Sequence, residues 1–118
     1  MEPKEFDFEF PRGDNCPLTF VLTDDQKQAI DDMTGTNIYF TVKTSPNETS
    51  YLFQKTLNGG TITQDGNQYT IIIAPTDTDN LDYGSYWFDV SLVGTDFKTT
   101  IIIGRMTLTN EVTFAVNE

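Results

Sequence analysis

The sequence predicts an all-β fold, a single-domain antiparallel β-sandwich of about eight or nine strands. Apolar and polar residues alternate with a period of two along most of the chain, and clusters of turn-forming residues separate the alternating runs. No stretch with a helical period is long enough for a substantial helix. Because no repeat or linker divides the sequence, we expect one domain over residues 1–118.

The clearest strand follows Gly84, in the sequence GSYWFDVSLV. The large apolar side chains of one parity are Tyr86, Phe88, Val90 and Leu92. Successive strand residues point to opposite faces, so these four are expected to face the core. Trp87 has the other parity. It lies either on the outer surface, as an interface anchor or sugar-stacking platform, or beneath the corner at residues 77–82, and parity leaves both positions open.

The N-terminal segment predicts an edge strand. Phe6, Phe8 and Phe10 alternate with acidic residues, and Pro11 ends the run. A strongly alternating terminal segment can lie at the border of a sheet, where unpaired backbone groups accept a strand from a neighbour. We therefore expect residues 1–10 to form an edge or exchange strand. The candidate interface residues are Phe6, Phe8, Phe10, Tyr83 and Trp87.

The remaining strands are expected as short runs between turns. They cover residues 18–22, 38–42, 51–57, 62–64, 69–74 and 99–103, with a hairpin turn at Asp65-Gly66. Residues 24–33 form an irregular connection with room for one helical turn, and residues 75–83 form a corner. Gly104 is expected to bend or bulge the chain. The final run keeps its parity from Met106 to Val116, either as one strand or as two strands broken at Asn110.

The charge of the chain excludes some classes of partner. Seven basic and 18 acidic residues give a net charge of −11, which repels nucleic-acid backbones and anionic membranes. We expect this charge to oppose aggregation and edge pairing. A decoy that mimics DNA is the other interpretation. The acidic residues are interleaved with apolar ones instead of arrayed along a helix, which speaks against it.

Few residues could carry catalysis or hold a metal. The chain has no histidine, and Cys16 is its only cysteine, so an intrachain disulfide and a four-cysteine zinc site are excluded. Cys16 is expected to be a half-buried packing residue. No carboxylate pair has the spacing of a glycosidase. We expect no enzyme activity, cofactor or metal. A signal peptide and a membrane span are also absent from the sequence, which predicts a cytoplasmic protein or one exported without a signal.

Three short motifs have ordinary structural interpretations. Arg12-Gly13-Asp14 spells the integrin-recognition tripeptide but also suits a turn between strands. Asn47-Glu48-Thr49 is a glycosylation sequence that would matter only after secretion. The carboxylates of Asp77, Asp79 and Asp82 could hold calcium, but their spacing is not that of an EF-hand loop. We expect Asp77 or Thr78 to cap a single helical turn.

The order of the motifs resembles that of small tail and baseplate β-domains of phages, including the N-terminal domain of the baseplate upper protein (BppU) family of Gram-positive phages. The similar pieces are RGD at 12–14, PLTFVL at 17–22, TG at 34–35, IYFTVK at 38–43, the hairpin at 65–66, IAPTDT at 73–78, GSYWFDV at 84–90, GRMTL at 104–108 and VT at 112–113. The resemblance covers nearly the whole chain from Pro11 onward.

This resemblance implies an Ig-like β-sandwich with a structural or assembly role in a tailed-phage virion or a prophage-encoded tail. It implies no catalytic residues. The implied partners are other tail or baseplate proteins, with self-association, and the implied location is the virion tail after synthesis in the bacterial cytoplasm. Two alternatives stay open. One is a carbohydrate-binding module that uses Trp87 and Tyr83 as stacking platforms, and the other is an acidic phage inhibitor of a host protein.

Overall fold

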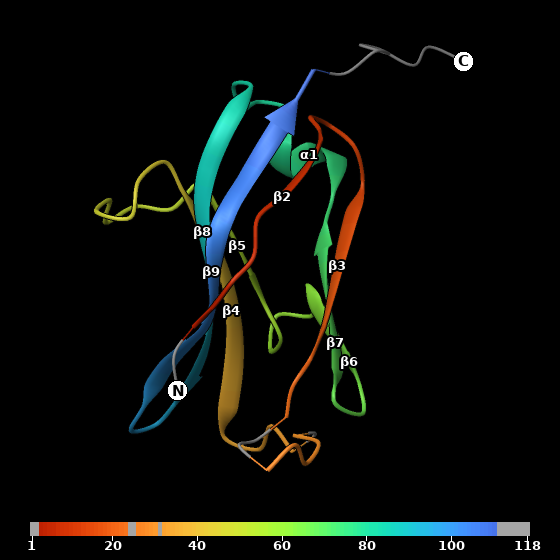
Figure 1. Cartoon of the computed structure of the whole chain (residues 1–118), viewed down its shortest axis with the longest axis vertical. Coiled ribbons are helices and arrows are strands. Elements are labelled where there is room, and N and C mark those ends of the chain that lie inside the picture. Colours follow the sequence, from red (N-terminus) through yellow and green to blue (C-terminus); the bar gives the residue numbers. More distant parts are fainter. Residues whose placement is uncertain (1–2, 24–25, 31, 111–118) are drawn as a thin grey trace.

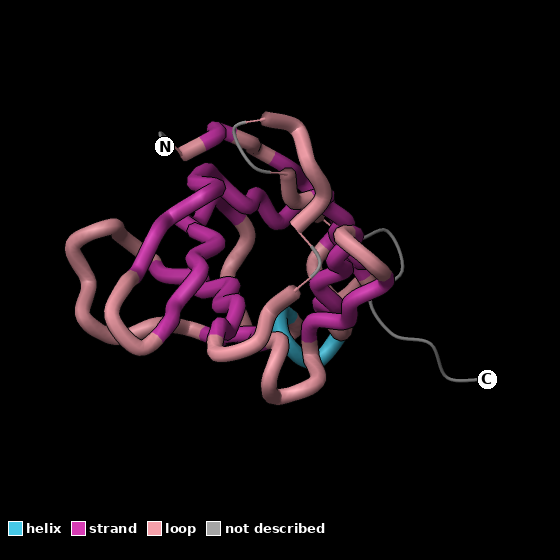
Figure 2. Tube along the Cα trace, turned by 90° about the horizontal axis from the view of Figure 1, so that it is seen from below, coloured by secondary structure: helices cyan, strands magenta, loops and turns pink. Residues whose placement is uncertain are grey.

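The structure, a computed structural model, describes residues 3–23, 26–30 and 32–110. The fold is a sandwich of two sheets, with 56% of the described residues in strands and 4% in helix, which confirms the all-β prediction. Figure 1 shows the two sheets facing each other, and Figure 2 shows the same two layers from below. The described residues form nine strands and one helical turn, and each sheet contributes one face to the core.

The larger sheet has six strands. They are β1 (Lys4–Glu5), β2 (Phe8–Pro11), β4 (Thr36–Lys43), β5 (Phe53–Thr56), β8 (Gly84–Gly94) and β9 (Lys98–Thr109). Their order is β1-β9-β8-β4-β5, and β2 also pairs with β9. The smaller sheet has the order β3-β7-β6, with β3 (Cys16–Val21), β6 (Ile62–Asp65) and β7 (Gln68–Ile73). The turn α1 (Pro75–Thr78) joins the sheets at one end (Figure 1).

The strand order is that of an Ig-like sandwich. Three strands in the order β3-β7-β6 face a sheet that contains β9-β8-β4-β5, which corresponds to the variable type of immunoglobulin fold. The start of β8 adds a second Ig-like feature. The hydroxyl of Tyr86 donates a hydrogen bond of 2.8 Å to the carbonyl oxygen of Asp82, four residues upstream. This is the geometry of a tyrosine corner, and it fixes the chain where it enters the larger sheet.

Two strand pairings depart from the antiparallel prediction. Both N-terminal strands run parallel to β9, with Lys4 opposite Ile102 in β1 and Phe8 opposite Met106 in β2. Sequence periodicity gives the face of a strand but not the direction of its partner, so the pattern contained no signal for these pairings. Both strands lie at the border of the larger sheet, beside β9.

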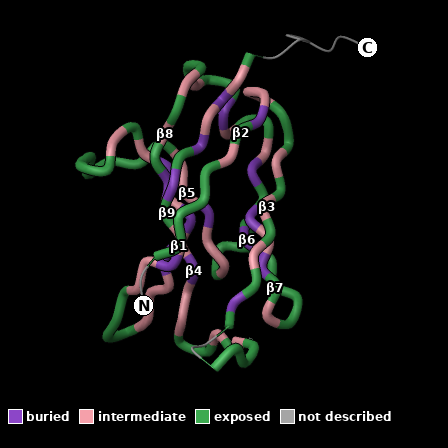
Figure 3. The backbone as a smooth tube through the Cα atoms, in the orientation of Figure 1, coloured by how far each residue is buried: buried purple, intermediate pink, exposed green. Residues whose placement is uncertain are grey.

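The core lies between the facing sheets, where Figure 3 shows the buried stretches. Its centre is formed by Ile38, Phe40 and Val42 of β4, Tyr69, Ile71 and Ile73 of β7, Phe88 and Val90 of β8, and Met106 and Leu108 of β9. The alternation in the sequence predicted the inward parity of β4, β8 and β9, whereas β7 contains the run Ile71-Ile72-Ile73, which has no alternation and predicts no face. Full burial of a large apolar side chain contributes about 1.5–3 kcal/mol, so this cluster is the main source of stability.

Several local predictions can be compared with the structure. The hairpin is present, with Asp65 opposite Gln68 and a loop of Gly66 and Asn67; the φ of +65° at Gly66 fits a type II′ turn. Tyr51 precedes β5 instead of lying in it. The described part of residues 24–33 contains no helical turn. Met106 and Leu108 lie in β9, whereas the predicted continuation through Val112, Phe114 and Val116 lies outside the described residues.

The prediction for Gly104 was wrong. Gly104 lies within an unbroken β9, directly opposite Phe88, and the register shift of the β8–β9 pair lies elsewhere, between Val90 and Ser91. A Cβ atom on Gly104 would stand 1.8 Å from the carbonyl oxygen of Phe6. The glycine therefore permits close approach of the N-terminal segment, which is another established use of glycine in a strand.

Candidate interaction surfaces

The N-terminal segment forms a ladder of three phenylalanine rings along the edge of the larger sheet. The centroids of Phe6 and Phe8 are 6.0 Å apart and those of Phe8 and Phe10 are 5.9 Å apart, both stacked. Phe10 is buried and Phe8 packs edge-on against the core ring of Phe88, whereas Phe6 is 48% exposed. The ladder thus runs from the core to the surface, and Phe6 is its accessible end.

The side of the sandwich between this ladder and β3 contains an apolar hollow of about 550 Å³. One wall consists of consecutive residues from Leu18 to Thr23, and Lys4 and Phe6 also line the hollow. The opposite wall is the inner face of the larger sheet, where Phe40, Phe88 and Ile101 contribute. The described residues therefore do not seal the two sheets against each other on this side.

The outer edge of β3 has no strand partner among the described residues, because the smaller sheet ends there. Leu22, just past β3, donates its N–H to the carbonyl oxygen of Asn67, so alternate residues of β3 turn their backbone groups toward β7. Thr19 and Val21 lie between them, and their N–H and C=O groups point outward. An unpaired strand edge thus adjoins the apolar hollow.

Trp87 and Tyr83 do not form a shared platform. Trp87 is 37% exposed on the outer face of β8, where the guanidinium carbon of Arg105 lies 4.7 Å from a ring centroid. Tyr83 precedes the strand, and its ring lies 4.2 Å from the guanidinium carbon of Arg12. Each ring is therefore already covered by an arginine on one face, which occupies a surface that a sugar ring would need for stacking.

The tripeptide at residues 12–14 is built into the fold. The Gly13 N–H donates to Oγ1 of the fully buried Thr78 at 2.9 Å, and Nη1 of Arg12 donates to the carbonyl oxygen of Leu81 at 3.1 Å. Asp14 closes the turn by donating its N–H to the carbonyl oxygen of Pro11. The first two residues of the motif thus fasten the β2–β3 turn to the corner after α1, in agreement with the turn interpretation.

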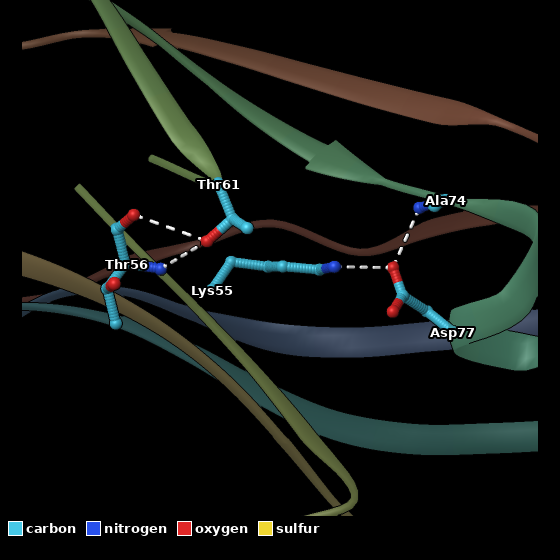
Figure 4. Close-up of polar contacts among 5 residues, drawn as sticks. All are labelled: Lys55, Thr56, Thr61, Ala74 and Asp77. Carbon is cyan, nitrogen blue, oxygen red and sulfur yellow. Dashed lines mark hydrogen bonds and ion pairs between the residues drawn. The ribbon is translucent and has the colours of Figure 1, made fainter. Parts of the chain in front are cut away.

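Asp77, one of the three carboxylates considered as calcium ligands, makes contacts that hold the fold together. Its Oδ2 lies 2.6 Å from Nζ of Lys55 and accepts the N–H of Ala74 at 2.7 Å, as Figure 4 shows. The single helical turn is present, but Ala74 is its N-cap, and Asp77 reaches back to it from the third position. Among the described residues, no group of three or more histidine, cysteine, aspartate or glutamate side chains is placed to hold a metal ion.

Cys16 is half-buried at the start of β3, which agrees with its predicted packing role. Burial, and then the negative charge of Asp14, raises the pKa of the thiol above its ordinary value of 9.0. A raised pKa lowers the fraction of thiolate at neutral pH and therefore the reactivity of the sulfur.

A second hollow, of about 290 Å³, lies on the outer face of the larger sheet. It is lined by Tyr39, Thr41, Lys43, Thr49, Tyr51, Gln54, Asp89, Ser91, Val93 and Lys98. We did not expect this site from the sequence. A signal for part of it existed, because Tyr39 and Lys43 have the parity opposite to that of the core residues Ile38, Phe40 and Val42 in the same strand.

The chain matches no protein-family model and no curated protein sequence. No helix among the described residues is long and apolar enough to cross a membrane, since α1 has four residues.

Proposed function

We propose that the chain is a structural module that assembles the tail or baseplate of a tailed phage or prophage and catalyses no reaction. The motif order that resembles phage tail β-domains supports this role, as does the Ig-like sandwich. The proposed partners are other tail proteins and further copies of the chain, and the proposed location is the virion tail. The proposal needs a surface suited to repeated protein contacts.

The observation that carries the proposal is the open edge of β3 beside the apolar hollow. An added strand would pair with the outward backbone groups of Thr19 and Val21 and would place alternate apolar side chains in the hollow. Val21 is 59% exposed and Phe6 is 48% exposed, so both edges of the hollow present apolar surface to a partner.

A comparison with the opposite end of the larger sheet strengthens this assignment. β5 is an edge strand that turns Lys55 inward, and an inward charge is a device that prevents edge pairing. β3 has the sequence CPLTFV and carries no charged residue. Pro17 is its only edge-blocking residue, and it stands near one end of the strand. The middle of β3 is therefore the stretch best suited to strand addition, because just beyond its far end Thr23 forms a bridge with Ala29 and the Leu22 carbonyl accepts the N–H of Ile30.

The test is self-association, measured by light scattering coupled to size exclusion. We expect a discrete oligomer at about 100 µM protein, where mass action favours association. The decisive variant is Val21→Pro, because it removes an outward N–H donor without touching a hydrogen bond to β7. We expect this variant to shift the oligomer to monomer. Val21→Thr is the matched control, since it keeps the N–H and the branched shape.

Removal of residues 1–10 provides a second, independent measurement. If the N-terminal ladder contributes to the interface, the shortened chain associates less while keeping its sandwich, as judged by circular dichroism. Undiminished association of the shortened chain with an intact fold would remove the ladder from the interface. A wild-type chain that stays monomeric, or an oligomer that Val21→Pro leaves unchanged, would contradict strand addition at β3.

Carbohydrate binding is the second candidate function. The observation that favours it is the hollow on the outer face of the larger sheet, not the pair of Trp87 and Tyr83.

A further inference from the structure

The outer face of the larger sheet concentrates positive charge in a chain that is strongly acidic. Only seven of the 118 residues are basic, yet Lys43 and Lys98 both line the hollow on this face. Arg105 lies on the same face. It is directly opposite the outward Trp87 in the β8–β9 ladder, and Trp87 is directly opposite Lys43 in the β4–β8 ladder. Asp89 is the one carboxylate in the lining. Two lysines against one carboxylate thus give the lining itself an excess of positive charge, which favours an anion.

The polar groups of the hollow are held in place before any ligand binds. Lys43 donates from Nζ to the carbonyl oxygen of Glu48 at 2.9 Å, which ties the 44–52 loop to the rim. Gln54 donates from Nε2 to Oγ1 of Thr41 at 2.9 Å. These contacts orient an ammonium group and an amide along the floor and wall of the hollow. Preorganised groups bind a ligand without the ordering penalty that flexible groups incur.

Two tyrosines supply the apolar surface of the same hollow. Tyr39 projects from β4 and is half-buried, whereas Tyr51 stands on the loop and is 54% exposed. Figure 1 shows this loop, in yellow, projecting on the side of the larger sheet that faces away from β3, β6 and β7. Within the described part of the chain, neither ring forms an aromatic pair or lies beneath a cation, in contrast to Trp87, which lies beneath Arg105. Their faces are therefore available for stacking.

We propose that this hollow binds a short anionic saccharide, which is a site distinct from the assembly surfaces at β3 and the N-terminal ladder. A sugar ring packs on Tyr51 and Tyr39, since the C–H face of a sugar is apolar and its rim is polar. Its carboxylate or phosphate lies between Lys43 and Lys98, and its hydroxyls reach Asp89 and Gln54. The volume of about 290 Å³ suits one or two sugar units.

The experiment is a titration of the ¹⁵N-labelled full chain, followed by amide NMR shifts. The probes are cellobiuronic acid, glucose 6-phosphate, neutral cellobiose, inorganic phosphate and a triglutamate peptide. We expect the two anionic sugars to shift residues of the hollow and to bind at least about fivefold more tightly than the other three probes, a difference near 1 kcal/mol. The two anionic sugars also distinguish carboxylate from phosphate as the recognised group.

Variants locate the binding. Tyr51→Ala and Lys98→Ala should each weaken binding of the better sugar by about tenfold, the order of effect expected for an anchor residue. Tyr83→Ala and Lys27→Ala are the matched controls, since they remove the same side-chain types away from the hollow, and they should leave the affinity unchanged. Both pairs are on the surface, so amide spectra should confirm that each variant keeps its fold.

Three results would overturn the proposal. The first is an absence of shifts in the hollow with about 10 mM of either anionic sugar, a concentration that detects even weak affinity. The second is equal affinity for cellobiose, phosphate or triglutamate, which would show that the hollow selects no anionic sugar. The third is an equal loss of affinity in the control variants.

Discussion

The buried Lys55 of β5 and the half-buried Asp77 of α1 form an ion pair, with Nζ and Oδ2 2.6 Å apart. Lys55 points inward because it is paired with the core residue Phe40 across the β4–β5 ladder. Asp77 lies in the turn that leads from the smaller sheet to the larger one. The pair thus connects the far edge of one sheet to the corner between both, and it gives an inward lysine the partner that burial requires.

The two halves of this pair should respond unequally to substitution. Asp77→Asn leaves the Lys55 ammonium buried without a counter-charge and should destabilise the fold by about 3 kcal/mol. Lys55→Met should cost about 1 kcal/mol or less, because Asp77 keeps the Ala74 N–H and methionine fills the same space. Urea unfolding measures both, as a shift of the midpoint at constant slope.

The double variant with Lys55→Met and Asp77→Asn is the control for this asymmetry. It should be more stable than Asp77→Asn alone, because no buried charge is left unpaired. An Asp77→Asn chain within about 0.5 kcal/mol of wild type would show that the pair is exposed and weak.

Gly104 should be intolerant of any side chain. A Cβ at this position meets the carbonyl oxygen of Phe6, which is backbone and cannot turn away, so Gly104→Ala should destabilise by about 2 kcal/mol. The strain falls on the N-terminal segment, and limited proteolysis should therefore cleave the variant near residues 4–10 before the sandwich opens.

Gly94→Ala is the matched control for this substitution. The new methyl would meet the ring of Phe97, which is 49% exposed and can swing aside. We expect little loss of stability and no cleavage at the N terminus. Equal behaviour of the two alanine variants would disprove the close-approach role of Gly104.

The contribution of the tyrosine corner to stability should be measurable by removing the hydroxyl of Tyr86. Tyr86→Phe removes the donor to the carbonyl oxygen of Asp82 and should cost about 1 kcal/mol. Burial, followed by the charge of Asp82, raises the pKa of Tyr86 above its ordinary value of 10.0. The folded chain thus holds this proton more tightly than the unfolded chain. The contribution of Tyr86 to the free energy of unfolding is therefore fully present below pH 10 and is lost as the pH rises through the pKa of the folded state.

The measurement is urea unfolding of the wild type and Tyr86→Phe at several pH values from neutral to alkaline, in a Cys16→Ala background that removes the thiol titration. The difference in stability between the two chains should shrink as the pH rises. A difference that stays constant to the highest pH at which the sandwich persists would argue against ionisation at the corner.

Strand parity predicted most of what faces the core, including residues that we did not single out. Lys55 shares its parity with Phe53 and Leu57, so the sequence contained the signal of an inward lysine in need of an acidic partner. The identity of that partner was not predictable, since Asp77 meets Lys55 only through the packing of the corner.

The candidate surfaces were harder to predict because they depend on which strands are neighbours. The periodicity of residues 16–21 is the same whether β3 is central or at an edge, and only the sheet order exposes its backbone groups. The hollow on the outer face likewise requires β4, β5, β8, the start of β9 and a loop to converge. Outward parity predicts that Tyr39 and Lys43 lie on a surface. It does not predict that Tyr51 and Lys98 lie next to them.

Cys16 should react slowly with thiol reagents in the folded chain. Burial, and then the charge of Asp14, raises the pKa of this thiol, so at pH 8 a smaller fraction is thiolate than in the unfolded chain. We expect reaction with Ellman's reagent to be slower in buffer than in urea at the same pH, and the ratio of the two rates to approach one as the pH rises. Asp14→Asn removes the nearby charge and should speed the reaction in buffer, whereas Asp65→Asn, at the distant hairpin, should not. A folded rate equal to the unfolded rate at pH 8 would show that the thiol is fully accessible, and the half-buried position at the start of β3 would then be wrong.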